Sequence, residues 1–224
     1  MDYLRRPLSP AMWSRALFMW GVLALVALLL GVAALWMGNF IQDNIKDELE
    51  AQQISFPPEE AMSDQEREID GLTAYAGEQL STGDQAKVYS EYILLHMNQS
   101  AEEAGHPGAT YATLGGVQRG LRADVQAAQD AGDEQALEEA EAELAEVTAL
   151  RNTMLTGSNL RGNLLSAYGW GNVGQGVFFL GIGIIVLAII FTLLFFFEWR
   201  RGHLPEGETH AERSYPAGTA ESAA

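Results

Sequence analysis

The chain has 224 residues, of which 30 are acidic and 13 basic, and its formal net charge at pH 7 is −17. Such a charge repels nucleic acid and anionic lipid head groups, which excludes a nucleic-acid partner. The chain has no cysteine, which excludes disulfides, thiolate metal sites and thiol redox chemistry. Two long segments without any charge also exclude a simple soluble globular domain.

The first predicted element is a membrane-spanning helix over residues 16–37. An uninterrupted apolar run extends from Ala16 to Trp36, and at about 1.5 Å per residue it is about 30 Å long, the thickness of a bilayer's hydrocarbon core. A cleaved signal peptide is the alternative, because Arg5-Arg6 resembles a twin-arginine signal. The run exceeds the usual apolar region of such peptides, about 7–15 residues, and no A-x-A-like cleavage site follows it. An uncleaved anchor is therefore predicted.

A helical domain is predicted between the two spans, over residues 38–172. The first helix should continue to about Gln53, and the Pro57-Pro58 pair then ends it. Two more helices are expected over residues 64–80 and 81–97. The later of these should be capped at Ser81 or Thr82, with a loop after it over residues 104–108. The stretch 54–108 as a whole stays open, because its "ISF" segment also fits a short strand.

An antiparallel helical hairpin is predicted from Ala109 onward. Apolar residues recur at steps of three and four in both of its helices: Leu114, Val117, Leu121, Val125 and Ala128 in the first, and Leu137, Ala140, Leu144 and Val147 in the second. Between the two helices, Gly132 fits a helix C′ position and Asp133 an N-cap. The glutamates of the second helix lack an EF-hand pattern, so they are interpreted as a solvated face and not as a calcium site.

The second span is predicted over residues 173–197, around the apolar run from Gly176 to Phe197. The preceding segment, Thr156 to Gly176, carries one charge and six glycines. A place next to the head-group layer explains the missing carboxylates, and tyrosine and tryptophan are the residue types that sit in this layer. The predicted membrane-interface residues are Trp13, Trp20, Trp36, Tyr168, Trp170 and Trp199.

The glycines and alanines of the two spans form stripes of small residues. Each glycine costs nearly 1 kcal/mol of helix stability relative to alanine. Close packing of the helix backbones, which small residues allow in membranes, would offset this cost. The predicted helix-packing residues are Gly21, Ala24, Ala27, Gly31, Ala34 and Gly38 on the first span and Gly174, Gly181 and Ala188 on the second. The intramolecular pairing of the spans is favoured, although a second copy or another membrane protein would use the same stripes.

Basic residues predict the orientation, because they are enriched on the cytoplasmic side of bacterial membranes. The topology-setting residues are Arg5, Arg6, Arg15, Arg200 and Arg201. Both termini, residues 1–15 and a disordered tail over residues 198–224, should therefore be cytoplasmic. Residues 38–172, which hold 24 acidic and 7 basic side chains, should lie outside. The sequence thus predicts an all-α protein of a bacterial plasma membrane, with two transmembrane helices flanking an extracytoplasmic helical domain.

Several short segments come in an order that resembles a known family: "ISFPPEEA", "GLTAYA", "EYILLHM", "GATYATLGG" and "LRNTMLTGSNLRGNLLSAYGWGNVG". They are similar to an actinobacterial family of small two-span membrane proteins, whose members often carry the label "aromatic ring-opening dioxygenase". The resemblance spans roughly residues 54–175. It implies the two-span layout and no established activity, so no functional residues come with it.

The dioxygenase label has no support in the residues. A non-haem iron site of this kind needs two histidines and a carboxylate around the metal. His203 and His210 fall in the cytoplasmic tail, which leaves His96 and His106 outside. His96, within "YILLHM", is expected to be packed or hydrogen-bonded, and His106 is expected in a loop. We predict no catalytic residue, no metal site and no cofactor.

Three functions compete. A non-enzymatic membrane protein is favoured, an accessory or scaffold component of a membrane assembly that presents its acidic helical domain. An extracytoplasmic sensor or ligand-binding module that signals through a partner is the alternative. An oligomeric channel ranks third, because the spans have no ionisable residue. The expected partners are the lipid bilayer and either other membrane-protein subunits or a second copy.

Overall fold

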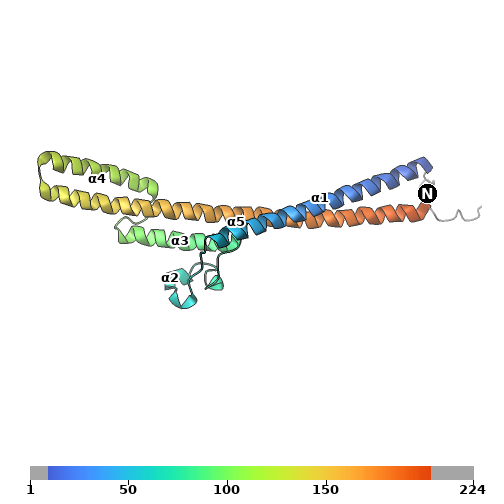
Figure 1. Cartoon of the computed structure of the whole chain (residues 1–224), viewed down its shortest axis with the longest axis horizontal. Coiled ribbons are helices and arrows are strands. Elements are labelled where there is room, and N and C mark those ends of the chain that lie inside the picture. Colours follow the sequence, from blue (N-terminus) through green and yellow to red (C-terminus); the bar gives the residue numbers. More distant parts are fainter. Residues whose placement is uncertain (1–9, 203–224) are drawn as a thin grey trace, which may run out of the picture. The chain divides into compact units, whose positions relative to one another are not determined.

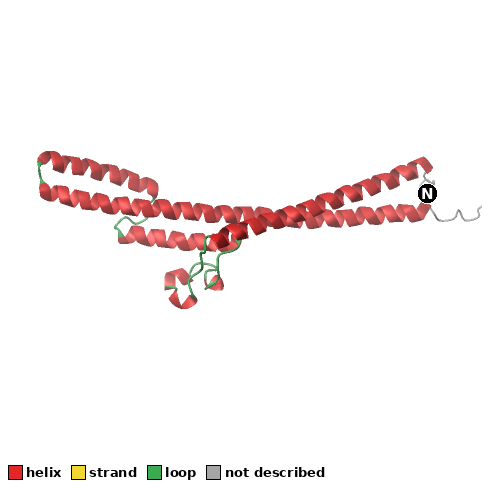
Figure 2. Cartoon of the chain, viewed as in Figure 1, coloured by secondary structure: helices red, strands yellow, loops and turns green. Residues whose placement is uncertain are grey.

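The computed structural model describes residues 10–202, which are helical wherever they have regular structure (Figure 1). The elements in chain order are α1 (Pro10–Ala51), the 3-10 helix η2 (Glu59–Ala61), α2 (Asp64–Arg67), the 3-10 helix η3 (Thr73–Tyr75), α3 (Gly83–Glu103), α4 (Tyr111–Ala131) and α5 (Glu134–Gly202). Figure 2 shows helices joined by short loops, with no strand in the described part. The all-helical class is as predicted.

The chain divides into two compact units. The smaller is formed by the described parts of Met1–Gly31 and Gly183–Ala224, and the larger is Val32–Ile182. α1 and α5 each contribute residues to both units.

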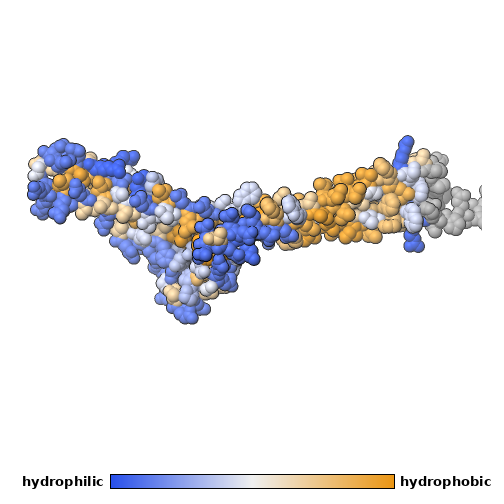
Figure 3. Space-filling model, in the orientation of Figure 1, coloured by the Kyte–Doolittle hydropathy of each residue, from blue (hydrophilic) through white to orange (hydrophobic). Residues whose placement is uncertain are grey.

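Within residues 10–202, two helices are long and apolar enough to cross a membrane, α1 and α5. Only 6% of the most apolar window in α1 and 11% of that in α5 is buried. The core helix of a soluble protein is mostly buried, so these windows do not form such a core. Figure 3 shows the hydrophobic surface gathered over these apolar runs.

The first helix continues well past its apolar run, as predicted. α1 ends at Ala51, where the N–H groups of Gln52 and Gln53 bond to the carbonyls of Leu49 and Glu50. Gln53 has a φ of 53°, the left-handed conformation that often follows a helix and usually belongs to glycine.

The helix predicted over residues 64–80 is wrong. Helical structure is limited there to the short α2 and η3, and Gly71 and Gly77 adopt φ angles of 83° and 73° that a helix cannot contain. The "ISF" segment instead pairs with the chain near Gln79. The N–H of Phe56 bonds to the carbonyl of Glu78, and a single antiparallel bridge joins Ser55 to Gln79. Residues 54–108 are thus not entirely helical.

The later helices begin close to where the sequence predicts, but α3 extends to Glu103, past the predicted end at Met97. Thr82 caps α3 in a capping box with Gln85. Gly132 closes α4 with a φ of 68°, and the Asp133 carboxylate accepts a hydrogen bond from the N–H of Ala136 at the start of α5. The predicted hairpin is therefore formed by α4 and the first part of α5.

Two apolar cores hold the larger unit together. One joins α1, the segment before α3, α3 and α5, and its buried members are Ile45, Leu49, Phe56, Met62, Leu72, Leu80, Ala86 and Leu164. The other joins α3, α4 and α5 through Ala101, Leu114, Leu121, Val147, Leu150 and Met154. α5 contributes residues to both cores, so it connects them.

The glycine-rich segment Thr156 to Gly176 is helical throughout, because it lies inside α5. α5 therefore runs without a break from the acidic hairpin through the second apolar run. It ends at Gly202, past the predicted start of the tail at Glu198. The remainder of the predicted tail, from His203 on, lies outside the described residues, as do residues 1–9 of the predicted cytoplasmic N-terminus.

Candidate functional site

Small residues lie where α1 and α5 meet within the smaller unit. A methyl group added to Gly31 would lie 2.7 Å from the Ile185 side chain, and one on Gly21 would lie 3.6 Å from the Phe195 ring. Ala27 and Ala188 are 8% and 4% exposed. Ala24, half-buried, lines a shallow pocket beside Ala188.

The same pattern holds in the larger unit. A methyl group on Gly38 would lie 2.8 Å from the backbone nitrogen of Phe178, and one on Gly181 would lie 2.8 Å from that of Leu35. A methyl group on Gly174 would meet the Ile41 side chain at 2.8 Å. These distances are shorter than carbon contacts allow, so the two backbones approach as closely as glycine permits. Ala34 is half-buried on the same helix.

Two more glycines of the glycine-rich segment lie in contact with α3. A methyl group on Gly157 would lie 2.6 Å from the sulfur of Met97. Gly171 lies against Gly83, at 3.4 Å from added Cβ to Cα. By contrast, methyl groups on Gly162 and Gly176 would have no heavy atom within 4 Å beyond their own helix. The segment thus carries glycines of two kinds, at contacts and on a free face.

The six predicted interface aromatics differ in exposure. Trp36, Trp170 and Trp199 are 63%, 59% and 46% exposed. Trp36 stacks on Phe40 with 5.6 Å between ring centroids. The other three are half-buried. Their contacts are a hydrogen bond from Trp13 Nε1 to the Glu198 carbonyl, a ring contact of Trp20 with Phe191, and the Lys87 ammonium over the Tyr168 ring.

The predicted topology-setting arginines are only partly described. Arg15, Arg200 and Arg201 are exposed, and Arg201 lies 4.0 Å from the Glu198 carboxylate. Arg5 and Arg6 lie outside the described residues. Exposure is the state that lets an arginine interact with head groups or water.

A buried carboxylate, which the sequence prediction missed, ties α2 to α3. Glu66 is 7% exposed and accepts hydrogen bonds from the N–H of Ser63 at 2.6 Å and from the His96 ring, with 3.0 Å between Oε1 and Nε2. The Ser63 N–H is the main cause that lowers the pKa of Glu66 below its ordinary value of 4.5. Burial, with the Glu66 charge as a second cause, raises the pKa of the Tyr92 hydroxyl. The signal was present in the sequence, since S-x-x-E at Ser63 is a capping box.

Two of the four histidines, His96 and His106, lie within the described residues. His96 is hydrogen-bonded to Glu66 and packs edge-on against the Tyr92 ring, with 4.4 Å between centroids, which matches its predicted role. His106 follows the end of α3 in the predicted loop. Within residues 10–202, no group of three or more His, Cys, Asp or Glu side chains is placed to hold a metal ion.

A polar network joins α4 to α5. Arg151 lies over the Tyr111 ring, 4.0 Å from its centroid, and donates hydrogen bonds to the Tyr111 carbonyl and to Gln118 Oε1. The buried Gln118 in turn donates to Thr148 Oγ1 at 2.7 Å. The network satisfies the buried amide, so it stabilises the hairpin. No sequence motif marks it.

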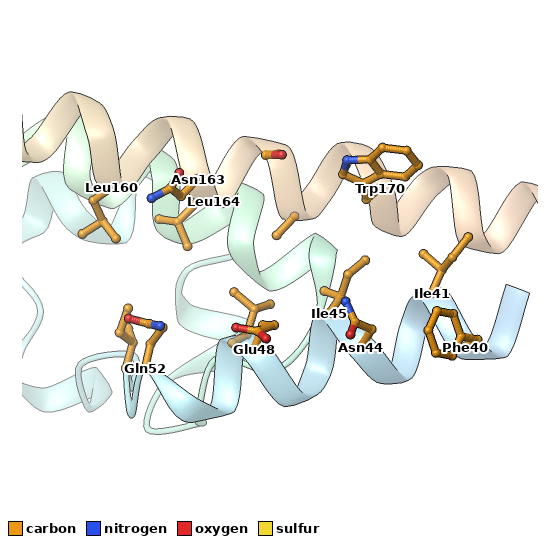
Figure 4. Close-up of a pocket in the computed structure, with 14 residues that line it drawn as sticks. Phe40, Ile41, Asn44, Ile45, Glu48, Gln52, Leu160, Asn163, Leu164 and Trp170 are labelled. Carbon is orange, nitrogen blue, oxygen red and sulfur yellow. The ribbon is translucent and has the colours of Figure 1, made fainter. Parts of the chain in front are cut away.

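A groove of about 470 Å³ lies between α1 and α5 (Figure 4). Phe40 and Trp170 lie at one end of it, and Gln52 and Leu160 at the other. The lining residues are Phe40, Ile41, Asn44, Ile45, Glu48, Leu49, Gln52, Ile54, Leu160, Asn163, Leu164, Ser166, Ala167 and Trp170. Several of these belong to the first apolar core, so the groove exposes one side of that core.

Comparisons with protein-family models, with curated proteins and with solved structures found no match.

Proposed function

We propose that the chain is a non-enzymatic integral membrane protein that serves as an accessory or scaffold component of a membrane assembly. In this proposal α1 and α5 cross a bacterial plasma membrane, both termini are cytoplasmic, and residues 38–172 lie outside. The acidic helical domain is the surface that a partner protein recognises. The proposal agrees with the two-span layout that the resemblance to the actinobacterial family implies.

One observation carries this proposal. The two apolar helices pack on each other through glycines in both units, and each also supplies part of the apolar core of the polar domain. A cleaved signal peptide makes no such contacts in the mature protein, so α1 is proposed to be a permanent anchor.

The hairpin offers the free surface. Val117 of α4 is 37% exposed, and a methyl group on Gly120 would have no neighbour within 4 Å beyond its own helix. The part of α5 that belongs to the hairpin adds a run of exposed glutamates. An acidic helical surface of this kind favours a partner with a basic patch.

The test is photocrosslinking in native membranes. A photoreactive amino acid at Val117 or Gly120 should yield a discrete crosslinked species, and mass spectrometry after mild-detergent extraction should identify its partner. The matched control places the same amino acid at Leu180, on the exposed face of the second apolar run, where lipid adducts are expected. Recovery of uncrosslinked protein from every hairpin position would contradict the proposal.

A ligand-binding sensor is the second candidate, and the groove is the observation that favours it. Its volume lies within the range of about 300–1,000 Å³ for small-molecule sites. A rise in the melting temperature of the purified protein on addition of a ligand would support this function. A flat response across a screen of solutes and lipids would count against it.

A further inference from the structure

We propose that the groove between α1 and α5 binds one lipid molecule from the adjoining leaflet. An acyl chain lies along the groove floor, and an uncharged or ammonium-bearing head group contacts the rim. This inference rests on the membrane insertion in the proposed function, but it does not depend on the partner assembly proposed there.

The groove opens onto the lipid-facing surface of the same two helices. Phe40 and Trp170, at its end, are 53% and 59% exposed. One turn closer to the apolar runs, Trp36, Met37 and Val173 are 63%, 43% and 47% exposed. An acyl chain can therefore pass from the bilayer to the groove over a continuous apolar surface, without exposing methylene groups to water.

The floor is apolar along its length. Ile41 and Ile45 of α1 face Leu164 and Ala167 of α5 across the groove. From Phe40 to the end of α1 at Ala51 the groove follows about 16 Å of helix, similar to the half-thickness of about 15 Å that one leaflet's acyl chains fill. The dimensions thus suit one chain, and the volume of about 470 Å³ suits a ligand of lipid-chain size.

The rim carries side chains that can both donate and accept hydrogen bonds. Asn44 and Glu48 lie one turn apart on α1, and Gln52 follows directly after the helix end. Asn163 and Ser166 lie on α5. Amide and hydroxyl groups of this type can bond to the ester and hydroxyl oxygens of a lipid.

The charge at the rim selects the head group. Glu48 is the one ionisable side chain among the described residues that line the groove, and none of the ion pairs in the described part of the chain involves it. An anionic head group next to this carboxylate would be repelled, whereas an ammonium group would be attracted. Phosphatidylethanolamine therefore fits better than phosphatidylglycerol.

The test uses the full-length protein in nanodiscs that contain both lipids. One of the two carries a diazirine on its acyl chain, and mass spectrometry maps the residues labelled on irradiation. We expect the phosphatidylethanolamine probe to label groove residues such as Ile45 and Leu164. The phosphatidylglycerol probe should label only the exposed residues of the apolar runs.

Two matched serine variants make the test specific. Ser166→Trp fills the groove and should abolish labelling of Leu164, while Ser158→Trp, on an exposed position of α5 that does not line the groove, should leave it unchanged. Circular dichroism confirms that both variants are folded. Labelling confined to the apolar runs, or groove labelling that persists in Ser166→Trp, overturns the proposal. Equal groove labelling by both probes overturns its head-group part.

A partner helix is the competing occupant. A photoreactive amino acid at Asn163 that captures another protein in native membranes, and no lipid in nanodiscs, would overturn the lipid proposal and support the assembly. Groove labelling in purified protein with no partner captured from the hairpin would do the reverse. The two failures are therefore distinguishable.

Discussion

At the scale of single residues, the glycines of α5 fall into two classes, according to whether an added methyl group would clash with a neighbour. At Gly181 an added methyl group meets the backbone of Leu35, whereas at Gly176 it meets open space. Backbone cannot move aside as a flexible side chain can, so the first site has no room for alanine. The second site should gain from alanine, which favours the helix more than glycine does.

We therefore expect Gly181→Ala to lower the free energy of unfolding by about 1–3 kcal/mol, the usual cost of overpacking. Gly176→Ala should leave it unchanged or raise it by up to about 1 kcal/mol. Titration of mixed micelles with a denaturing detergent, followed by circular dichroism, measures both. Equal effects at the two positions would show that the helices do not pack through Gly181.

The left-handed residue after α1 gives a stabilising prediction. Gln53 has a φ of 53°, a conformation that glycine adopts without the strain felt by other residues. Gln53→Gly should raise the free energy of unfolding by up to about 1 kcal/mol, while the β-branched Gln53→Val should lower it. Thermal unfolding of the two variants decides between a strained and a relaxed backbone at this residue.

The buried Glu66 predicts a pH dependence. Its pKa is lower in the folded protein than the ordinary value of 4.5, mainly because Ser63 N–H bonds to the carboxylate. The ionised form is thus favoured by folding, so its stabilisation is present above pH 4.5 and is lost as the pH falls through the lowered pKa. Between about pH 6 and about pH 3, Glu66→Gln should lose less stability than the unmodified protein. Denaturant midpoints at both pH values measure this, and parallel losses would contradict it.

At the scale of elements, capping side chains determine where the helices of the domain begin. α2, α3 and α4 each start with a capping box, at Ser63, Thr82 and Thr110. Such caps satisfy N–H groups that have no partner inside the helix.

The cap of α3 can be tested alone. Thr82→Ala should lower the free energy of unfolding by about 1 kcal/mol, and Thr82→Gly by only a few tenths. The comparison separates loss of the hydroxyl from a change in backbone preference. Little loss in either variant would mean that the N–H of Gln85 finds another acceptor.

The sequence predicts those elements whose signals are local. The apolar runs, the hairpin turn at Gly132 and the start of α3 are all encoded by neighbouring residues, and the structure has them at the predicted positions. The segment around Gly71 differs because its structure depends on distant contacts. Leu72 and Leu80 are fully buried against α1 and α5, and folding them inward outweighs the helix propensity between them.

In the candidate site, too, local features can be predicted from the sequence and long-range contacts cannot. A stripe of small residues is visible in the sequence, but the partner of each glycine is not, since it depends on the register between α1 and α5. The groove has no sequence signature, because its two walls lie more than a hundred residues apart in the chain. The network around Arg151 is hidden for the same reason.

At the scale of the whole molecule, the proposed topology can be measured directly. The cysteine-free chain accepts single cysteines that report accessibility. In protoplasts, a membrane-impermeant maleimide should label Glu139→Cys at once, and it should label Ser222→Cys only after lysis. The opposite pattern would invert the orientation, and labelling of both before lysis would contradict cytoplasmic termini.

The position of α5 as the last described helix has a consequence for biosynthesis. α1 and α3 leave the ribosome first, and Gly38 and Gly83 lack their neighbours until Phe178 and Gly171 have been translated. Both apolar cores are also incomplete until their α5 residues have been translated. A nascent chain that stalls before this helix carries uncovered cores and an unpaired apolar helix, which are the features that quality-control proteases and chaperones recognise. Translation of α5 is thus the step at which separate helices become a folded protein.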